Sequence, residues 1–595
     1  MKRFFLLCTL MALVAVLITA CGGASATATP APTATRAATT APATTGPAAT
    51  AAPSAAPATA VPPTATPRPT TPPQPTATSV PTSSGTLNIA LLNLAAAGML
   101  PGQVGNEAGG FEMMYDKWVG TNDAGKPDGT QGILSSWTAS PDSKTWTFKL
   151  RNDVTFSNGN KVTSADLKAN ITYATPTGGG NYGTQVRTLA SMDQPDDATL
   201  AVNLTDGNIF WPIAFLSPLG TGTVPQYAME GKALAAGIPE FSKKPVGSGP
   251  YLFQSIQVGD RITFEAVAKH WLFGVPRTKT VVYIAIPEES TRKALVQQGQ
   301  LDLAPVSTSS VKSLNQAGFK TVAARDKQAV VYIFQEQYAE EYPGYGKNPI
   351  ANQQVRQALT FHAIDRQALV DSIMNGIGIP WVDYPLLPSE LSYKAGARPL
   401  PAFDPAKAKK MIADAGWPNG FEMDMQVFTP GRFSEGLELS EALAVMWEKV
   451  GLKINRMPRP AAQSIRTADQ VDKIIYKKPT VWGLYAVAVG PVGTTTASNF
   501  HTVGNPNTQT RDPVSAQLVK DWTASPNTDE YIKRGQAYQD YETANVQGFG
   551  TLLLTGDVMV QSNKIPAAWN PGNDMHNSPG TIRGARFQYA VAGRF

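Results

Sequence analysis

The sequence predicts a mixed α/β protein with several sheets and more than one domain. Two observations lead to this fold class. Short apolar alternations typical of strands are interspersed with helix-like periodicities along most of the chain. This patterned region, from about Thr86 to Phe595, is too long for a single hydrophobic core, so two or three domains are expected. No internal repeat of fixed period is present, which disfavours a solenoid or propeller.

The N-terminus has the three parts of a secretory signal peptide over residues 1–20. Lys2 and Arg3 form a basic start, Phe4 to Ile18 is almost entirely apolar, and small residues follow. The run Ile18-Thr19-Ala20-Cys21 resembles the bacterial lipobox. That resemblance implies that Cys21 becomes the first residue of the mature chain and carries a lipid. The alternative is an ordinary signal peptide with a coincidental cysteine.

Cysteine usage limits the chemistry of the mature chain. The chain has two cysteines, and Cys8 lies in the segment expected to be removed. With Cys21 alone remaining, an internal disulfide, a Cys-based zinc site and thiol catalysis are excluded. No other stretch is apolar enough to cross a membrane, so the rest of the chain is expected to be exported and held only at its N-terminus.

Residues 21–84 are expected to form a disordered tether. They are almost entirely Ala, Thr, Pro, Ser and Gly, which bury too little apolar surface to offset chain entropy. Proline favours extended conformations of about 3.1 Å per residue, so the tether would reach on the order of 150 Å. The same composition is compatible with O-glycosylation, which the sequence does not demonstrate.

The net charge of the globular body is close to zero. Lys2, Arg3, Arg36 and Arg68 are the basic residues before position 85, and no acidic residue precedes it. Leaving these four out of the 50 basic residues gives 46 against 45 acidic ones. No block of lysine and arginine marks a nucleic-acid surface, so nucleic acid is not an expected partner.

Strand patterns begin the body. The segment from Leu87 to Leu92 starts as a strand, and Thr145 to Leu150 alternates between apolar and polar residues. A further short strand is expected from Val154 to Phe156, before the tight-turn pair Asn158-Gly159.

Helix patterns follow. Ser164 is expected to cap a helix whose apolar face includes Leu167 and Ile171. Two helices are expected at 353–361 and 365–375, the second ending at Gly376. Asp404-Pro405 predicts another helix start, with Gly416 at its end.

The common catalytic and metal-binding patterns are absent. The four histidines, at positions 270, 362, 501 and 576, form no metal-ligand pair, and no Gly-x-Ser-x-Gly elbow occurs. Gly120 to Lys126 has the glycine and lysine spacing of a P-loop, but Pro127 replaces the magnesium-binding hydroxyl and no apolar strand precedes it. Carboxylates are scattered. We therefore expect no enzyme activity, no metal and no cofactor.

Five segments of the body together resemble the sequence signature of a known protein family. They occur in the family's order and span most of the body. The segments are Pro141-Asp142 with Trp146, Phe148 and Asn158-Gly159; Pro245-Val246-Gly247-Ser248-Gly249-Pro250-Tyr251; Ile286-Pro287 with Thr291-Arg292 and Asp302; Val355-Arg356 with Ile364-Asp365-Arg366; and Phe403-Asp404-Pro405 with Ala415-Gly416. In this order, the segments resemble the family 5 extracellular solute-binding proteins of ABC importers. Most of these residues also have structural explanations: Arg356 and Asp365 are expected at a helix surface or cap.

The resemblance implies a type II periplasmic-binding-protein-like fold with a ligand cleft between two lobes. Lobe I would span 85–305, with an extra subdomain at about 130–235, and lobe II would span 306–515. Residues 516–595 would return to lobe I. The strands crossing between the lobes would lie near 329–335 and 481–489.

The ligand is not fixed by the resemblance. Peptide-binding members resemble one another in a Trp and an Asp shortly after the second crossing strand, and the Asp receives the ligand's amine. Here the stretch from Trp482 to Pro491 contains no Asp, which disfavours a free zwitterionic peptide. Only one of the adjacent pair formed by Gln335 and Glu336 is expected to face the cleft. The candidate ligand contacts are Tyr115, Phe334, Gln335, Glu336, Trp482, Tyr485 and Phe500, although core packing is an equal alternative for the aromatics at 482, 485 and 500.

The function expected from these features is capture of a peptide-like or other small organic solute and its delivery to an ABC importer permease. The chain would act as a monomer, lipid-anchored at the outer face of the cytoplasmic membrane. Two alternatives stay open at this point. One is a surface-anchored hydrolase or glycosidase with an unrecognised carboxylate pair, and the other is a ligand sensor on the same scaffold.

Overall fold

The computed structural model describes most of the body of the chain. The expected signal peptide, Cys21 and nearly all of the expected tether lie outside the described residues. The described residues are 83–92, 94, 111–122, 126–175, 188–216, 227–323, 328–334, 348–383, 386, 390–396, 399–428, 435–459, 479–488, 497, 512–545, 549–556 and 558–565.

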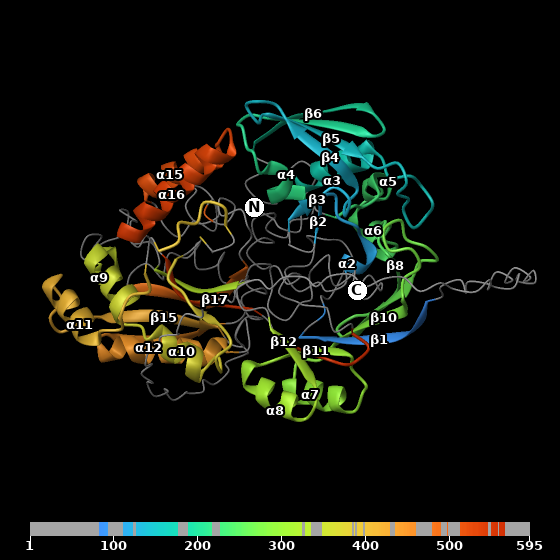
Figure 1. The fold of residues 1–595 in the computed structure, drawn as a ribbon. Helices are drawn as coiled ribbons and strands as arrows, with labels where there is room; N and C mark the ends of the chain where they lie inside the picture. The colour runs from blue at the N-terminus through green and yellow to red at the C-terminus, as the bar shows by residue number, and fades with distance from the viewer. Residues whose placement is uncertain are drawn as a thin grey trace, which may run out of the picture.

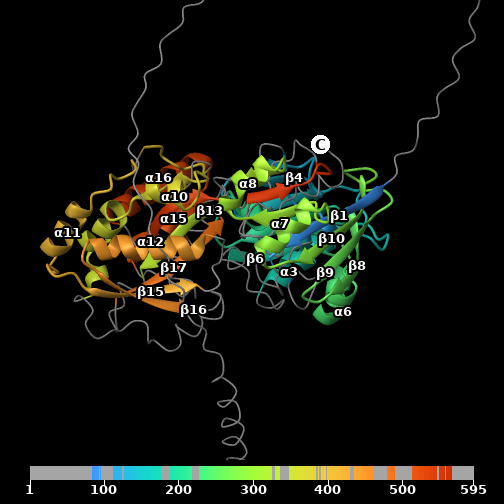
Figure 2. The ribbon, with the colours of Figure 1, turned by 90° about the horizontal axis from the view of Figure 1, so that it is seen from below.

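Two lobes lie side by side, each built around its own sheet (Figures 1 and 2). Lobe I has a seven-stranded sheet in the order β12-β19-β11-β1-β10-β9-β8. Its strands are β1 (Ser84–Leu91), β8 (Tyr251–Gln257), β9 (Arg261–Ala266), β10 (Thr278–Ala285), β11 (Leu303–Val306), β12 (Lys320–Ala323) and β19 (Val558–Gln561).

The lobe I sheet is buried on both faces, as β1 illustrates. Leu87, Ile89 and Leu91 face one hydrophobic core, while Ala90 joins another that includes Leu314. The first core is covered by α2 (Phe111–Met114), α5 (Gly231–Ala235) and α6 (Ile238–Lys243). The second is covered by α7 (Glu289–Gln297) and α8 (Val311–Gln316).

A separate four-stranded antiparallel sheet adds a subdomain to lobe I. Its order is β4-β5-β7-β6, formed by β4 (Leu134–Ala139), β5 (Thr145–Leu150), β6 (Leu189–Asp196) and β7 (Thr199–Leu204). The helices α3 (Ser164–Ala174) and α4 (Trp211–Leu216) pack on it, and the short pair β2 (Gly120–Thr121) and β3 (Pro127–Asp128) lies beside it. The predicted strand at 145–150 is confirmed, with Trp146, Phe148 and Leu150 buried.

Lobe II has a six-stranded sheet in the order β14-β18-β13-β17-β15-β16. Helices pack on one of its faces, around the buried side chains of Val330, Tyr332 and Phe334. The strands are β13 (Gln328–Phe334), β14 (Ile379–Pro380), β15 (Glu422–Phe428), β16 (Lys453–Arg459), β17 (Thr480–Ala488) and β18 (Phe549–Thr555). The helices are α9 (Gln353–Gln357), η6 (Ala358–His362), α10 (Arg366–Ser372), α11 (Pro405–Asp414) and α12 (Gly436–Lys449).

The sheet pairing moves both expected lobe boundaries. β12 pairs with β19 in the lobe I sheet, so lobe I continues to Ala323 and does not end at 305. β18 pairs with β13 in the lobe II sheet, so the chain returns to lobe I at Val558 and not at 516. No local sequence pattern marks these two boundaries, because membership of a sheet depends on pairing between strands that are distant in the chain.

Local sequence rules account for several helix ends. Asp404 caps α11 by accepting a 2.8 Å hydrogen bond from the backbone N–H of Lys407, as expected. The expected cap Ser164 is wrong by one residue. Thr163 holds that position, where its N–H and hydroxyl both donate to Asp166.

The region from 353 to 376 contains more elements than the two expected helices. α9 is short and passes into a π-helical turn, η6, before α10 begins after the capping residue Asp365. Arg356 is buried and does not lie on a helix surface as expected; its guanidinium donates to the carbonyls of Ile350 and Ala351. Val154–Phe156 forms only an isolated bridge, between Thr155 and Lys161.

Among the helices of the described residues, none has the length and apolar character needed to span a bilayer.

Candidate functional site

The two lobes are joined by a pair of chain segments that run side by side. β12 leads out of the lobe I sheet toward β13, and β18 leads out of the lobe II sheet toward β19. Ala323 pairs with Val558 on the lobe I side, and Gln328 pairs with Thr555 on the lobe II side. Both connections are therefore antiparallel neighbours at the lobe boundary. Two adjacent connections of this kind permit rotation of the lobes about one axis, as in hinge-closing binding proteins.

A buried polar contact lies close to this hinge. The carboxylate of Glu435, directly before α12 in lobe II, accepts hydrogen bonds from the backbone N–H and the hydroxyl of Thr308 in lobe I, at 2.8 and 2.9 Å. Both residues are buried. Desolvation raises the pKa of Glu435, and the nearby Glu438 adds to the shift, while the two hydrogen bonds from Thr308 oppose it.

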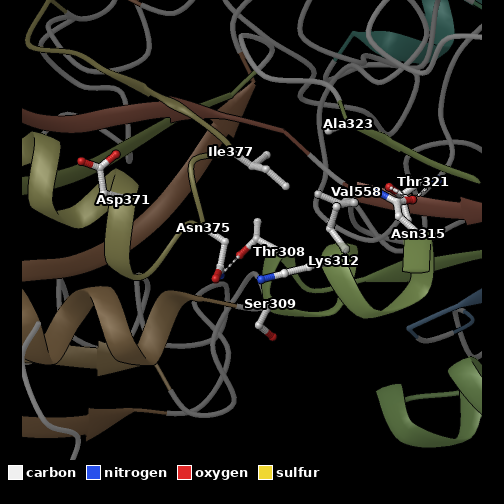
Figure 3. Close-up of a pocket in the computed structure, with 11 residues that line it drawn as sticks. Thr308, Ser309, Lys312, Asn315, Thr321, Ala323, Asp371, Asn375, Ile377 and Val558 are labelled. Carbon is white, nitrogen blue, oxygen red and sulfur yellow. Dashed lines mark hydrogen bonds between the residues drawn. The ribbon is translucent and has the colours of Figure 1, made fainter. Parts of the chain in front are cut away.

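The hinge also borders a cavity of about 690 Å³ whose walls come from both lobes (Figure 3). Thr308 and Asn375, joined by a 3.2 Å hydrogen bond, lie at the meeting point of the walls. Lobe I supplies Thr308, Ser309, Val311, Lys312, Asn315, Thr321, Ala323 and Val558, and lobe II supplies Asp371, Asn375 and Ile377. Because the walls belong to different lobes, the shape of this cavity depends on the hinge angle.

The register of the lobe II sheet shows which strand ends face lobe I. Gln328, Ala488 and Thr555 lie at neighbouring strand ends, on the side of the sheet next to the connections between the lobes. Phe334 and Val481 lie at the opposite ends of β13 and β17. β17 therefore ends, at Ala488, at the end of the sheet that lies next to lobe I.

Five of the seven candidate contacts are not defined at the level of side chains. Gln335, Glu336 and Phe500 lie outside the described residues. Trp482 and Tyr485 lie on β17, where their backbones pair with Ile333 and Val331. A ligand-contact role for these five residues stays a prediction.

The other two candidates lie inside hydrophobic cores. Tyr115 is fully buried in lobe I, where its ring stacks 6.4 Å from that of Phe241, and burial raises its pKa well above the ordinary value. Phe334 is fully buried in lobe II against Trp447, with ring centroids 6.3 Å apart. In the described conformation neither side chain offers an accessible surface to a ligand.

The Gly247-Ser248-Gly249 motif explains why Tyr115 is so enclosed. A β-carbon at Gly247 would lie 2.2 Å from the carbonyl oxygen of Met114, and one at Gly249 would lie 2.5 Å from the Met114 carbonyl carbon. The Gly249 N–H donates a 2.8 Å hydrogen bond to that carbonyl. The motif therefore sets a close backbone approach to the segment that carries Tyr115.

Gln328 is a polar residue that the sequence analysis did not single out. It is 2% exposed at the lobe-facing edge, and its amide nitrogen has no hydrogen-bond partner among the described residues. An unsatisfied buried donor is costly, which makes this position notable. Its signal in the sequence is weak: a single Gln before an apolar strand also suits a solvated strand start.

No group of three or more metal-ligating side chains occurs among the described residues. His270, the most buried histidine of this part of the chain, is held in lobe I by Asp116 at 3.2 Å, and the indole of Trp271 donates to the same carboxylate at 2.6 Å. The ring nitrogen Nδ1 of His270 accepts backbone N–H groups from Leu272 and Phe273. These contacts describe a structural cluster.

Residues 130–500, more than half of the chain, match the model of the bacterial extracellular solute-binding proteins, family 5. The chain belongs to this family. The two lobes, the additional subdomain and the paired crossing segments are the framework on which this family 5 protein would enclose a ligand.

Two curated relatives are similar to this chain over about half of its length. The chain is 29% identical to the heme-binding protein A of Haemophilus influenzae, over 56% of this chain and 62% of that protein. It is 28% identical to the glutathione-binding protein GsiB of Pectobacterium atrosepticum, over 49% of this chain and 53% of that protein. The family 5 chain thus matches between about half and three fifths of the length of these relatives.

Solved structures share the fold over nearly their whole length. NikA from Brucella suis in complex with Fe(III)-EDTA has a TM-score of 0.69 at 18% identity, covering 84% of this chain and 98% of that one. The dipeptide binding protein from Pseudoalteromonas sp. SM9913 in complex with Met-Leu has a TM-score of 0.67 at 18% identity, covering 84% and 99%. At such identities the similarity establishes the two-lobed α/β fold of this family 5 protein and not its ligand.

Proposed function

We propose that this family 5 protein is a lipid-anchored, extracytoplasmic binding protein that captures a small organic solute between its lobes and delivers it to an ABC importer permease. The observation that carries the proposal is the pair of antiparallel connections between two independently cored sheets. A hinge of this kind suits ligand capture, because closure removes the ligand from water and changes the surface presented to a partner.

We infer further that the ligand is uncharged or weakly charged, such as a glycan or a capped peptide. The stretch from Trp482 to Pro491 has no carboxylate that would receive a free peptide amine. Enclosing an ammonium group without a partner of opposite charge costs several kcal/mol in typical cases, on the order of 3–5. The aromatic residues at 482, 485 and 500 would hold neutral rings without that cost.

The names of the relatives specify different ligands, so they do not identify a single ligand for this chain. The names of the curated relatives specify heme and glutathione, and the solved structures contain ligands as different as a metal chelate and a dipeptide. One scaffold thus accommodates several chemistries, so specificity depends on side chains in the cleft. Glu336 is the residue on which the inference depends most, because a carboxylate there would replace the missing Asp.

The experiment is calorimetric titration of the purified protein with di- and tripeptides beside a set of oligosaccharides. Native mass spectrometry of protein isolated without unfolding would identify any retained ligand first. We expect binding of a neutral solute and none of free peptides. The matched pair Glu336→Gln and Glu341→Gln removes one carboxylate each from the same segment. Micromolar peptide binding that is lost only in Glu336→Gln would overturn the inferred ligand class and leave the solute-binding function intact.

A further inference from the structure

The short helix α4 of the lobe I subdomain is apolar on every side. Trp211 and Phe215, one helical turn apart, face the core of the subdomain. Phe210 and Ala214, also one turn apart, belong to a different apolar cluster. A helix that is apolar all round is expected to be buried on every side, and the residues of α4 belong to one cluster within the subdomain and to another shared with a second body. The second body here is formed by α15 (Pro513–Thr523) and α16 (Thr528–Asn545).

This helical hairpin is attached to lobe II. The hydroxyl of Tyr531 donates a 3.0 Å hydrogen bond to Glu390, and the side chain of Gln539 accepts a 2.9 Å bond from the N–H of Lys394. At the other end of α16, Gln353 and Arg356 of lobe II donate to the carbonyls of Ala544 and Asn545. The hairpin therefore moves with lobe II.

The tip of the hairpin nevertheless packs on lobe I. The rings of Phe210 and Tyr531 lie edge to face with centroids 4.4 Å apart. The hydroxyl of Ser143, in the turn before β5, donates a 3.2 Å hydrogen bond to the carbonyl of Pro526 between the two helices. We call this set of residues the hairpin contact. It comprises Ser143, Phe210, Ala214, Val519, Trp522, Pro526 and Tyr531.

The hairpin contact lies away from the hinge. In Figure 1 the tip of α15 and α16 approaches α4 on the upper side of the lobe boundary, while β11 and β12 meet lobe II on the lower side. The lobes thus touch at two separated places, near Thr308 and Glu435 at the hinge and at the hairpin contact. Rotation about the hinge separates the second place much more than the first.

We propose that the hairpin contact is a latch that holds the two lobes closed. Opening the lobes separates Phe210 from Tyr531 and exposes the apolar surface that Phe210 and Ala214 share with the hairpin. The contact therefore favours the closed state by the free energy of burying this surface, whether or not a ligand is present. Weakening the contact shifts the population toward the open state and lowers the apparent affinity for a ligand that binds only the closed state.

The test measures lobe separation directly and needs no ligand, so it is independent of the proposed ligand class. In the full chain, Cys8→Ser and Cys21→Ser remove both natural thiols. Spin labels are then placed at two exposed positions, Ala165→Cys on α3 and Lys409→Cys on α11. Pulsed electron spin resonance is expected to give one dominant distance for the otherwise unchanged chain. Phe210→Ala is expected to raise the ratio of open to closed molecules about tenfold or more.

The matched control is Phe403→Ala, which makes the same truncation at a side chain that is 39% exposed and outside the hairpin contact. Its distance distribution should equal that of the unchanged chain. Ser143→Ala, which removes only the hydrogen bond to Pro526, should give a smaller shift in the same direction and serves if Phe210→Ala fails to fold. An unchanged distribution in a cooperatively folded Phe210→Ala variant, or a dominant open state before substitution, would overturn the proposal.

Discussion

Three buried arginines show what the family's signature residues do in this chain. Arg292 donates to the carbonyls of Pro305, Ile286 and Pro287. Arg356 and Arg366 likewise donate to backbone carbonyls, and both are almost fully buried. A buried guanidinium satisfied by several carbonyls fixes the path of irregular backbone. The motifs around these residues therefore identify the scaffold, and they carry no information about the ligand.

Glu435 gives a prediction about pH at the residue scale. Its pKa is raised in the folded protein, so the folded state holds this proton more tightly than the unfolded state. The stabilising contribution is therefore present below the ordinary pKa of 4.5 and is lost as the pH rises through the raised folded value. Glu435→Gln keeps an acceptor for the Thr308 N–H and cannot ionise. We expect it to be at least as stable as the unchanged chain at pH 7, and equally stable near pH 4.

Denaturant unfolding of the two proteins between pH 4 and pH 8 measures this difference. Glu435→Ala is the comparison that removes the acceptor. It leaves the buried Thr308 N–H unpaired, at a cost of about 1–3 kcal/mol at every pH, while the Thr308 hydroxyl keeps the carbonyl of Ile373 as an acceptor at 3.3 Å. A Glu435→Gln variant that loses stability specifically at neutral pH would contradict the expected sign, and would show that the ionised carboxylate stabilises the hinge.

At the scale of elements, the features that depend on neighbouring residues were predicted, whereas the features that depend on pairing between distant strands were not. The cap at Asp404 and the strand at 145–150 follow from neighbours within a few residues, and both were predicted. The π-helical turn at 358–362 was not predicted, because no turn or cap residue marks it. The assignment of β12 and β18 to different sheets also depends on pairing between strands far apart in the chain, which no local pattern specifies.

The cap of α11 is expected to have a measurable effect on stability. Asp404→Ala removes the acceptor for the N–H of Lys407 and should destabilise the protein by about 1 kcal/mol. Asp414→Ala, at the exposed end of the same helix, loses only a surface ion pair with Lys410 and should change stability by less than about 0.5 kcal/mol. Chemical denaturation midpoints distinguish the two. Equal effects would mean that the cap is not the source of the loss.

At the scale of the whole molecule, the fold class and family could be predicted from the sequence, whereas the ligand-contacting side chains could not. Ordered motifs spread over the body are sufficient to identify a two-lobed scaffold. Which aromatic side chains face a cleft depends on the packing of both faces of each sheet. Phe334 shows this limit: it lies on one of the strands expected to cross between the lobes, yet β13 belongs to the lobe II sheet and the ring is enclosed by Tyr332 and Trp447.

The expected tether gives a prediction about the independence of the body. Deleting residues 30–80 should leave the melting temperature unchanged, because a segment with so few large apolar residues contributes no packing. Differential scanning calorimetry of the full and shortened chains makes the comparison. A clear fall in the melting temperature of the shortened chain would mean that the segment docks on the body.

The proposed anchor at Cys21 would determine where the whole molecule works. With one thiol remaining after removal of residues 1–20, lipid attachment has a single possible sulfur. Cys21→Ser should therefore release the protein into the medium or leave an uncleaved precursor. Cell fractionation with intact-mass measurement of the product separates these outcomes. Cys8→Ser, which changes the other cysteine within the expected signal peptide, is the matched control and should remain membrane-bound. A Cys21→Ser protein that is still processed and membrane-bound would refute the lipid anchor and require another mode of attachment.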